Sequence, residues 1–188
     1  MNPPIAMIGH GFDVAPMLQQ LERHPEWWDR YRQRTTAYQT PHKAVSDIWF
    51  RYNDWANFDG DMAKFNEEHE SVWYPVIADI PAGWSLARKV MRHVSGKQLG
   101  GVLMTRIPPG GEVKPHIDHG WHAGHYEKFA VQIKGNKDQA FCFDGVELSA
   151  EPGDLYTFDN SQTHWVRNDS DSERITLIIC IRRDANDS

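Results

Sequence analysis

The chain has 188 residues, of which 40% are hydrophobic and 24% charged, and it carries a net charge of −6 at pH 7. A chain of this size can bury one sizeable core, so we expect residues 1–188 to form a single domain. The acidic balance argues against nucleic acid as a partner, because proteins that bind it present a basic surface. Residues 1–12 lack the pattern of a secretory leader, and no stretch reaches the roughly 20 apolar residues of a membrane span. These features predict a cytoplasmic protein that does not enter a membrane.

The first part of the chain, residues 1–98, is predicted to be mainly helical. Helical patterns occur in three segments, at residues 16–28, 61–69 and 81–94, and each predicts a helix. Between the first two lies a strand-like run at residues 45–52, rich in β-branched and aromatic side chains. No repeat, low-complexity stretch or linker separates this part from the rest. We therefore expect the helices to pack on the second part of the chain.

The second part, residues 99–183, is predicted to be built from short strands. Apolar runs alternate with turns marked by proline, glycine, asparagine or aspartate, and this spacing is typical of a β-sandwich or a jelly roll. The turns are predicted at residues 108–111, 135–136, 144–145 and 152–153. The whole chain is thus predicted to be α+β, with N-terminal helices supporting a β-barrel.

The sequence His116-Ile117-Asp118 carries the strongest chemical signal. In an extended segment alternate side chains point the same way, so His116 and Asp118 can reach one ion while Ile117 faces away. His164, in a turn before an apolar strand, can add a second imidazole, and this set suits one face of an octahedral Fe(II). Arg174, ten residues further on, opens a strand and can clamp a carboxylate through two parallel hydrogen bonds. A lone His-x-Asp arises often by chance, but the combination points to an oxygenase.

These residues and their surroundings resemble the aspartyl/asparaginyl β-hydroxylase family of Fe(II)/2-oxoglutarate dioxygenases. The resemblance covers residues 99–182, and it implies a double-stranded β-helix, a cupin-like jelly roll, in this part of the chain. It also implies an enzyme, a hydroxylase that uses Fe(II), 2-oxoglutarate and O2. The segments that carry it are residues 103–118, 152–160, 164–168 and 174–179.

Carried over position by position, the resemblance assigns roles to five residues. It makes His116, Asp118 and His164 the iron ligands, and Arg174 the partner of the distal carboxylate of 2-oxoglutarate. Thr105 matches a hydroxyl position that assists the same carboxylate. Because the set of three ligands is complete, no ligand position is vacant for a halide, which favours hydroxylation over halogenation.

At the second carboxylate of 2-oxoglutarate the chain matches the family pattern only in part. Family members place a basic residue there and a histidine two residues later, whereas this chain reads Lys128-Phe129-Ala130. The resemblance therefore implies Lys128 as a co-substrate contact, with His125 as an alternative.

The implied reaction hydroxylates an aliphatic carbon of an amino acid, a peptide side chain or a similar small molecule, with succinate and CO2 as co-products. Two alternatives stay open, a metal-binding cupin-type protein that does not use 2-oxoglutarate and a nucleic-acid demethylase. Arg174 disfavours the first, since a metal-only cupin needs no carboxylate clamp. The acidic balance disfavours the second. Neither the substrate nor the oligomeric state follows from family membership.

Segments before the barrel line the mouth of the site in the resembled family. Arg34, His42 or Arg51 could then hold an acidic or amide-bearing substrate. The alternative is an ordinary solvated loop followed by an edge strand.

A histidine occurs at every third position from His116 through residues 119, 122 and 125. We do not expect a zinc cluster, because Gly120 and Gly124 disfavour the helix that would align these side chains. Residues 119–125 are predicted to be a flexible loop beside the iron, either a lid over the substrate or a solvated loop.

Overall fold

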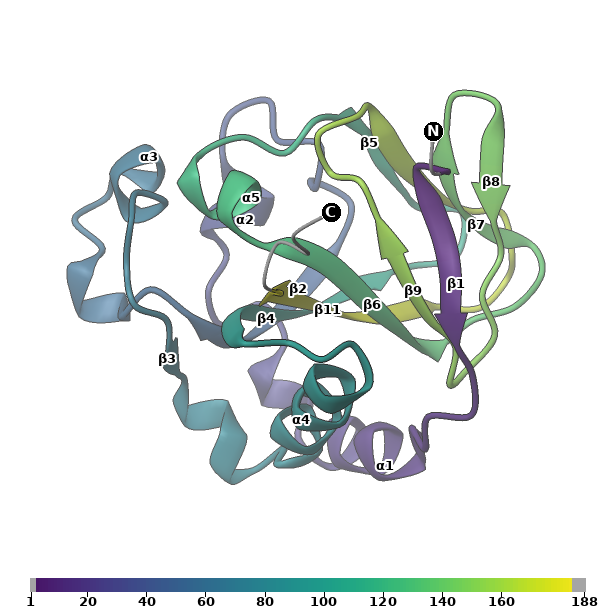
Figure 1. Ribbon diagram of the computed structural model, residues 1–188, viewed down its shortest axis with the longest axis horizontal. Helices are drawn as coiled ribbons and strands as arrows, with labels where there is room; N and C mark the ends of the chain where they lie inside the picture. The colour runs from purple at the N-terminus through teal and green to yellow at the C-terminus, as the bar shows by residue number, and fades with distance from the viewer. Residues whose placement is uncertain (1–2, 184–188) are drawn as a thin grey trace.

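The computed structural model describes residues 3–183 as two antiparallel β-sheets with helices on the outer side of the larger sheet (Figure 1). The strands are β1 (Ile5–Gly9), β2 (Ser46–Tyr52), β3 (Val72–Trp73), β4 (Gln98–Ile107), β5 (Glu112–His116), β6 (Glu127–Lys134), β7 (Gln139–Phe143), β8 (Val146–Leu148), β9 (Leu155–Phe158), β10 (His164–Asn168) and β11 (Arg174–Arg182). The α-helices are α1 (Ala15–Arg23), α2 (Gln33–Thr36), α3 (Met62–Phe65), α4 (Ala82–His93) and α5 (Trp121–His125), and the 3₁₀ turns are η1 (Pro25–Trp27), η2 (Trp55–Asn57) and η3 (Pro75–Ala78). Among residues 3–183, no helix has the length and apolar character needed to cross a membrane.

The strand order identifies the fold. The larger sheet has the order β1-β9-β6-β11-β4-β2-β3, and the smaller sheet has the order β5-β10-β7-β8. From β4 onward the chain passes repeatedly between the two sheets, so that β4, β6, β9 and β11 form one wall and β5, β7, β8 and β10 the other. This arrangement is a jelly roll, and the predicted α+β double-stranded β-helix is confirmed.

Side chains along β11 alternate between two environments, as the two-residue period of a strand requires. Leu177 and Ile179 are fully buried on the helix side of the sheet. Arg174 and Thr176 instead line a cavity between the two sheets. A slip of one residue would exchange the two sets, so the pairing of β11 with β4 and β6 determines which polar groups reach the cavity.

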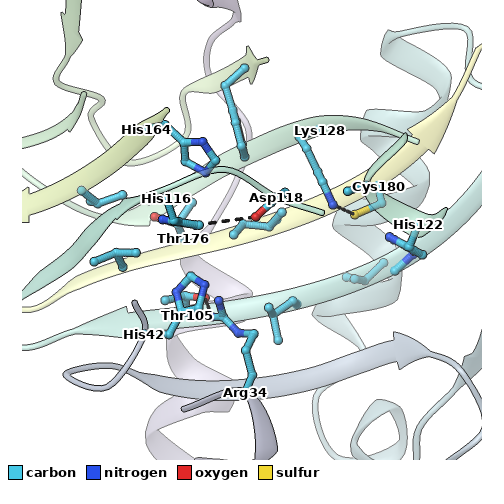
Figure 2. Close-up of a pocket in the computed structure, with 18 of the residues that line it drawn as sticks. Arg34, His42, Thr105, His116, Asp118, His122, Lys128, His164, Thr176 and Cys180 are labelled. Atoms are coloured by element: carbon cyan, nitrogen blue, oxygen red, sulfur yellow. Dashed lines mark hydrogen bonds and ion pairs between the residues drawn. The ribbon is translucent and has the colours of Figure 1, made fainter. Parts of the chain in front are cut away.

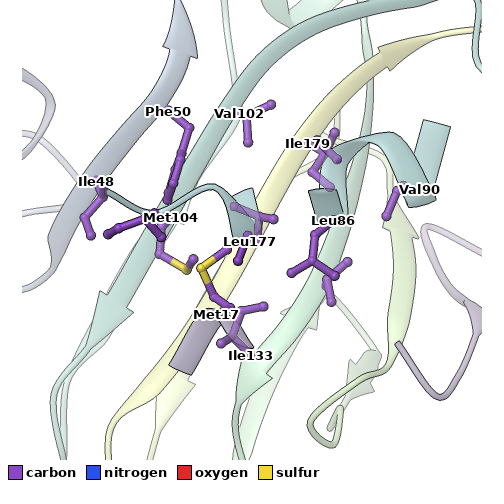
Figure 3. Close-up of a cluster of buried hydrophobic side chains, with 14 of the residues drawn as sticks. Met17, Ile48, Phe50, Leu86, Val90, Val102, Met104, Ile133, Leu177 and Ile179 are labelled. Atoms are coloured by element: carbon purple, nitrogen blue, oxygen red, sulfur yellow. The ribbon is translucent and has the colours of Figure 1, made fainter. Parts of the chain in front are cut away.

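The helices α1 and α4 contact each other and cover the outer face of the larger sheet. Leu86 and Val90, one turn apart on α4, pack with Leu177 of β11 and Met17 of α1 in the main core (Figure 3). Full burial of each such side chain contributes about 1.5–3 kcal/mol to folding. This packing holds the sheet rigid behind the cavity.

The N-terminal part contributes strands as well as helices. The predicted strand at residues 45–52 appears as β2, which pairs with β4 and is itself flanked by the short β3. At the opposite edge of the same sheet, β1 pairs with β9. The strand β1 was not predicted from the sequence. The N-terminal part therefore extends the barrel's larger wall at both edges.

The helix predicted at residues 81–94 is present as α4, whereas the other two are shorter than predicted. The segment at 16–28 is helical only to Arg23, because Pro25 cannot continue an α-helix and starts the turn η1. The segment at 61–69 forms only the short α3. Carboxylates at Glu67 and Glu68 follow it after Asn66, and negative charge disfavours the C-terminal end of a helix.

Candidate active site

Three side chains predicted as metal ligands meet between the two sheets. His116 ends β5 and lies opposite His164, the first residue of β10, in the strand register. Asp118 follows β5 by two residues, and its backbone N–H donates to the carbonyl of Asn160. One donor atom from each of the three residues lies within 4.8 Å of the others. Ile117 points away and is 37% exposed, as the alternation of an extended segment predicts.

Hydrogen bonds orient both imidazoles of this group. His116 Nδ1 donates to the carbonyl of Lys114 at 2.8 Å, and His164 Nδ1 donates to the carbonyl of Gln162 at 2.9 Å. Since a carbonyl only accepts, each ring carries its proton on Nδ1 and leaves the Nε2 lone pair free. Burial, followed by the nearby His164 and Arg34, lowers the pKa of His116 against the opposing effect of the Lys114 carbonyl and Asp118. The ring is therefore neutral at pH 7, as metal binding requires.

This donor set fits Fe(II). Two neutral imidazoles and one carboxylate on one side of a site, with open space on the other, are the ligands of a non-haem iron centre. The open space is a cavity of about 240 Å³ between the sheets. Figure 2 shows its walls, with His116, Asp118 and His164 around one point and polar residues of both parts of the chain facing them.

Arg174 lies in this cavity as a buried cation without an acidic partner. It is 5% exposed, and its Nη1 and Nη2 donate to Thr176 Oγ1 at 2.6 Å and to the hydroxyl of Tyr156 at 2.9 Å. Among residues 3–183 no carboxylate lies within ion-pair distance of it. A buried charge of this kind is costly unless a counter-ion binds, so the arrangement suits the carboxylate of a ligand. Sequence reasoning missed Tyr156 and Thr176, although Thr176 shares the cavity face of β11 with Arg174.

Thr105 lies beside the same region but already has partners. Its hydroxyl donates to Asp47 Oδ1 at 3.2 Å and accepts from Arg34 Nη2 at 3.1 Å. Arg34 in turn holds the fully buried Asp47 through two hydrogen bonds of 2.7 and 2.8 Å. Thr105 thus belongs to a three-residue network in the cavity wall, and its contact with a co-substrate carboxylate stays a prediction.

Lys128 faces the cavity from β6 and is 8% exposed. Its Nζ lies 3.2 Å from the thiol of Cys180, the residue opposite it in the strand register, and Cys180 is free and buried. Burial works against the charge, but Cys180 and Asp118 outweigh it and raise the pKa of Lys128. The alternative residue, His125, is half-buried, contacts Gln98 and Arg182, and is not among the residues that line the cavity.

The three candidates from the N-terminal part all line the cavity, but they differ in their contacts. Arg34 is paired with Asp47, as described above. Arg51 donates to the carbonyl of Leu99 and lies over the ring of Trp73. His42 packs edge-on against the ring of His116, with 4.8 Å between ring centroids.

Residues 119–125 differ from the flexible loop that we predicted. Residues Trp121–His125 form the short helix α5, with Gly120 at its N-cap in a left-handed conformation (φ 91°) and Gly124 N–H donating to the Gly120 carbonyl. The glycines therefore begin and continue this turn instead of preventing it. The helix buries His122 in the cavity wall, where its Nε2 accepts from the Gly101 N–H at 3.1 Å.

The buried His122 makes the protein less stable in acid. Burial, with smaller contributions from Lys128, His69 and His125, lowers the pKa of His122 from 6.5 to about 2. As the pH falls below 6.5 the unfolded chain binds this proton first, so stability is lost from about pH 6.5 downward. We expect the free energy of unfolding to fall between pH 7 and pH 5 by about 2 kcal/mol more in the wild type than in His122→Gln, as measured by denaturant titration.

His125, three residues further along the same helix, provides the matched control for this measurement. A His125→Gln variant removes only the smallest of these contributions and should keep most of the wild-type dependence of stability on pH. Equal pH dependence in wild type and His122→Gln would show that His122 is not neutral in the folded protein.

The fold is shared by solved 2-oxoglutarate oxygenases. A prolyl hydroxylase from Trichoplax adhaerens, in complex with a peptide fragment of the oxygen degradation domain of hypoxia inducible factor, is 12% identical, with a TM-score of 0.64 over 95% of this chain and 83% of that one. A viral collagen prolyl hydroxylase from Paramecium bursaria Chlorella virus-1, in its 2-oxoglutarate complex, is 12% identical, with a TM-score of 0.52 over 97% of both chains. An oxidoreductase of the 2-oxoglutarate–Fe(II) oxygenase family from Burkholderia pseudomallei is 12% identical, with a TM-score of 0.51 over 73% of this chain and 67% of that one. At this identity the likeness concerns the fold.

The sequence itself shows the family. No curated protein matches it significantly. The sequence profile described as aspartyl/asparaginyl beta-hydroxylase, however, matches residues 18–184, which is most of the chain and includes every candidate ligand. The chain therefore belongs to the aspartyl/asparaginyl β-hydroxylase family and is an enzyme of the 2-oxoglutarate–Fe(II) oxygenase type.

Proposed function

We propose that the protein hydroxylates an aliphatic carbon of an amino acid, a peptide side chain or a similar small molecule, and that it forms succinate and CO2 as co-products. One observation carries this proposal. The candidate ligands His116, Asp118 and His164 line the same cavity as Arg174, a buried cation with no acidic partner among residues 3–183. A dicarboxylate that binds a metal at one end needs a counter-charge of this kind at the other.

In this proposal His116, Asp118 and His164 hold Fe(II), and Arg174 holds the distal carboxylate of 2-oxoglutarate with Tyr156 and Thr176. Bound Fe(II), 2-oxoglutarate and O2 together supply the oxidising chemistry. The chain contributes the orientation of both imidazoles through the carbonyls of residues 114 and 162. It also contributes an apolar wall, in which Phe141 stacks on His164, and this limits the access of water to the metal.

Both parts of the chain supply residues to the cavity, which supports our proposal that residues 1–98 and 99–183 work as one domain. Arg34, His42 and Arg51 reach the cavity from the first part, and the candidate iron ligands come from the second. The prolyl hydroxylase from Trichoplax adhaerens was solved with a peptide. By analogy we include a peptide side chain among the proposed substrates.

The two alternatives explain less of the cavity. A cupin that binds metal alone has no use for a buried Arg174 without an acidic partner. A nucleic-acid demethylase needs a basic surface for phosphates, whereas the chain has a net charge of −6.

The test is an anaerobic titration of the protein with Fe(II), with and without 2-oxoglutarate. We expect a weak visible charge-transfer band when both are present, followed on admission of O2 by release of succinate. Iron binding without this band would contradict the proposal and favour the metal-only cupin.

A further inference from the structure

One polar side chain beside the candidate iron ligands has no hydrogen-bond partner for its ring. His42 follows α2 in the loop before β2, and the neighbouring Pro41 carbonyl accepts from the Lys114 N–H of β5 at 3.1 Å. This hydrogen bond holds the loop against β5, the strand that ends in His116. The ring of His42 consequently stands almost perpendicular to that of His116, at an interplanar angle of 83°.

Neither ring nitrogen of His42 has a hydrogen-bond partner among residues 3–183. Its Nδ1 is closed off from solvent, which leaves Nε2 as the ring nitrogen that a bound ligand can reach. His42 lines the cavity, which is where such a ligand would lie. Arg34 and Arg51, which reach the cavity from the same part of the chain, already donate to protein acceptors.

The position of His42 indicates which ligand it meets. In Figure 2 it lies on the side of Thr105 and Thr176. These two threonines are opposite one another in the strand register, and Thr176 contacts Arg174. A short dicarboxylate that reaches from Arg174 to the metal would therefore run along the threonine side and end beside His42 and His116.

Lys128 lies on the other side of the candidate metal site. In Figure 2 it is placed beyond Asp118, next to Cys180. Lys128 and His42 therefore approach the candidate metal site from opposite sides, and a contact from His42 leaves the contact predicted for Lys128 in place.

We propose that His42 donates a hydrogen bond from its Nε2 to the metal-proximal carboxylate of 2-oxoglutarate. This inference rests on the proposed function. It adds a residue from a distant part of the chain to the contacts of that carboxylate.

The test measures the Kd of 2-oxoglutarate in the anaerobic Fe(II) protein, by the charge-transfer band or by calorimetry. His42→Phe keeps the ring shape but removes both nitrogens, and we expect it to raise the Kd by about 10- to 100-fold, the range for a hydrogen bond to a charged group. His42→Gln places an amide N–H near the position of Nε2 and should recover much of this loss.

Two further measurements localise the effect. Affinity for Fe(II) alone should be the same in His42→Phe and wild type, since His42 is not a ligand. Competition by 4-oxopentanoate, which keeps the distal carboxylate and the ketone but lacks the metal-proximal carboxylate, should also be unchanged.

The inference is overturned if His42→Phe binds 2-oxoglutarate as tightly as the wild type. Equal weakening of 2-oxoglutarate and 4-oxopentanoate by His42→Phe would also overturn it. In each case the wild type still binds 2-oxoglutarate and the proposed function stands. Failure of the wild type to bind 2-oxoglutarate in the presence of iron would overturn both.

Discussion

Replacing His164 with alanine is expected to abolish turnover of 2-oxoglutarate and to weaken Fe(II) binding by more than about 100-fold. Loss of a residue that merely orients a metal ligand commonly costs about 10- to 100-fold in affinity, and loss of the ligand itself should cost more. His164 lies opposite His116 in the register of β5 and β10, so no neighbouring strand residue can take its place without a shift of the sheet. Anaerobic Fe(II) titration and succinate release measure the two effects.

The same experiment needs a check on folding, because His164 is 4% exposed and packs on Phe141. A His164→Gln variant retains a polar side chain of similar length and should also lose iron. Thermal unfolding of both variants without metal should stay close to that of the wild type. His125→Ala is the matched control: this histidine lies outside the cavity lining, so iron affinity and turnover should be unchanged. Wild-type iron affinity in His164→Ala would show that the ligand assignment is wrong.

Two of the candidate metal ligands, His116 and Asp118, could be predicted because the geometry of a single extended segment places their side chains. The two-residue period of an extended segment puts His116 and Asp118 on one side and Ile117 on the other, and the structure has this arrangement. The same period places Thr176 on the cavity face of β11 two residues after Arg174. The position of Thr176 on this face therefore follows from the sequence alone.

The rest of the cavity depends on contacts between distant segments. Tyr156 reaches Arg174 only because β9 and β11 both flank β6 in the larger sheet. His42 reaches His116 only because its loop is held on β5 by a backbone hydrogen bond. Neither pairing has a signature in local periodicity. The predictions for the segments that form α3 and α5 were wrong for a related reason. These short helices are stabilised by the segments they pack against more than by their own helix propensity.

Replacing Arg174 with methionine is expected to raise the Kd of 2-oxoglutarate by about 30-fold to several thousand-fold, which corresponds to the roughly 2–5 kcal/mol lost when one partner of a buried charge pair is truncated. The guanidinium is held by Tyr156 and Thr176, so its orientation exists before the ligand arrives and little entropy is lost on binding. Methionine fills similar volume without charge, which limits the disturbance to the sheet. The Kd is measured anaerobically with Fe(II) present.

Two variants distinguish the paired hydrogen bonds of the Arg174 guanidinium from the effect of its positive charge alone. Arg174→Lys keeps the positive charge but loses the planar pair of donors, so its Kd should lie between those of the wild type and Arg174→Met. Arg182→Met removes an exposed arginine from the far end of the same strand and should leave the Kd unchanged. Fe(II) affinity should be retained in Arg174→Met, Arg174→Lys and Arg182→Met, because none of these variants alters a candidate metal ligand. If Arg174→Met bound 2-oxoglutarate as tightly as the wild type, the buried guanidinium would serve the packing of Tyr156 and Thr176, and the distal carboxylate would have to bind elsewhere in the cavity.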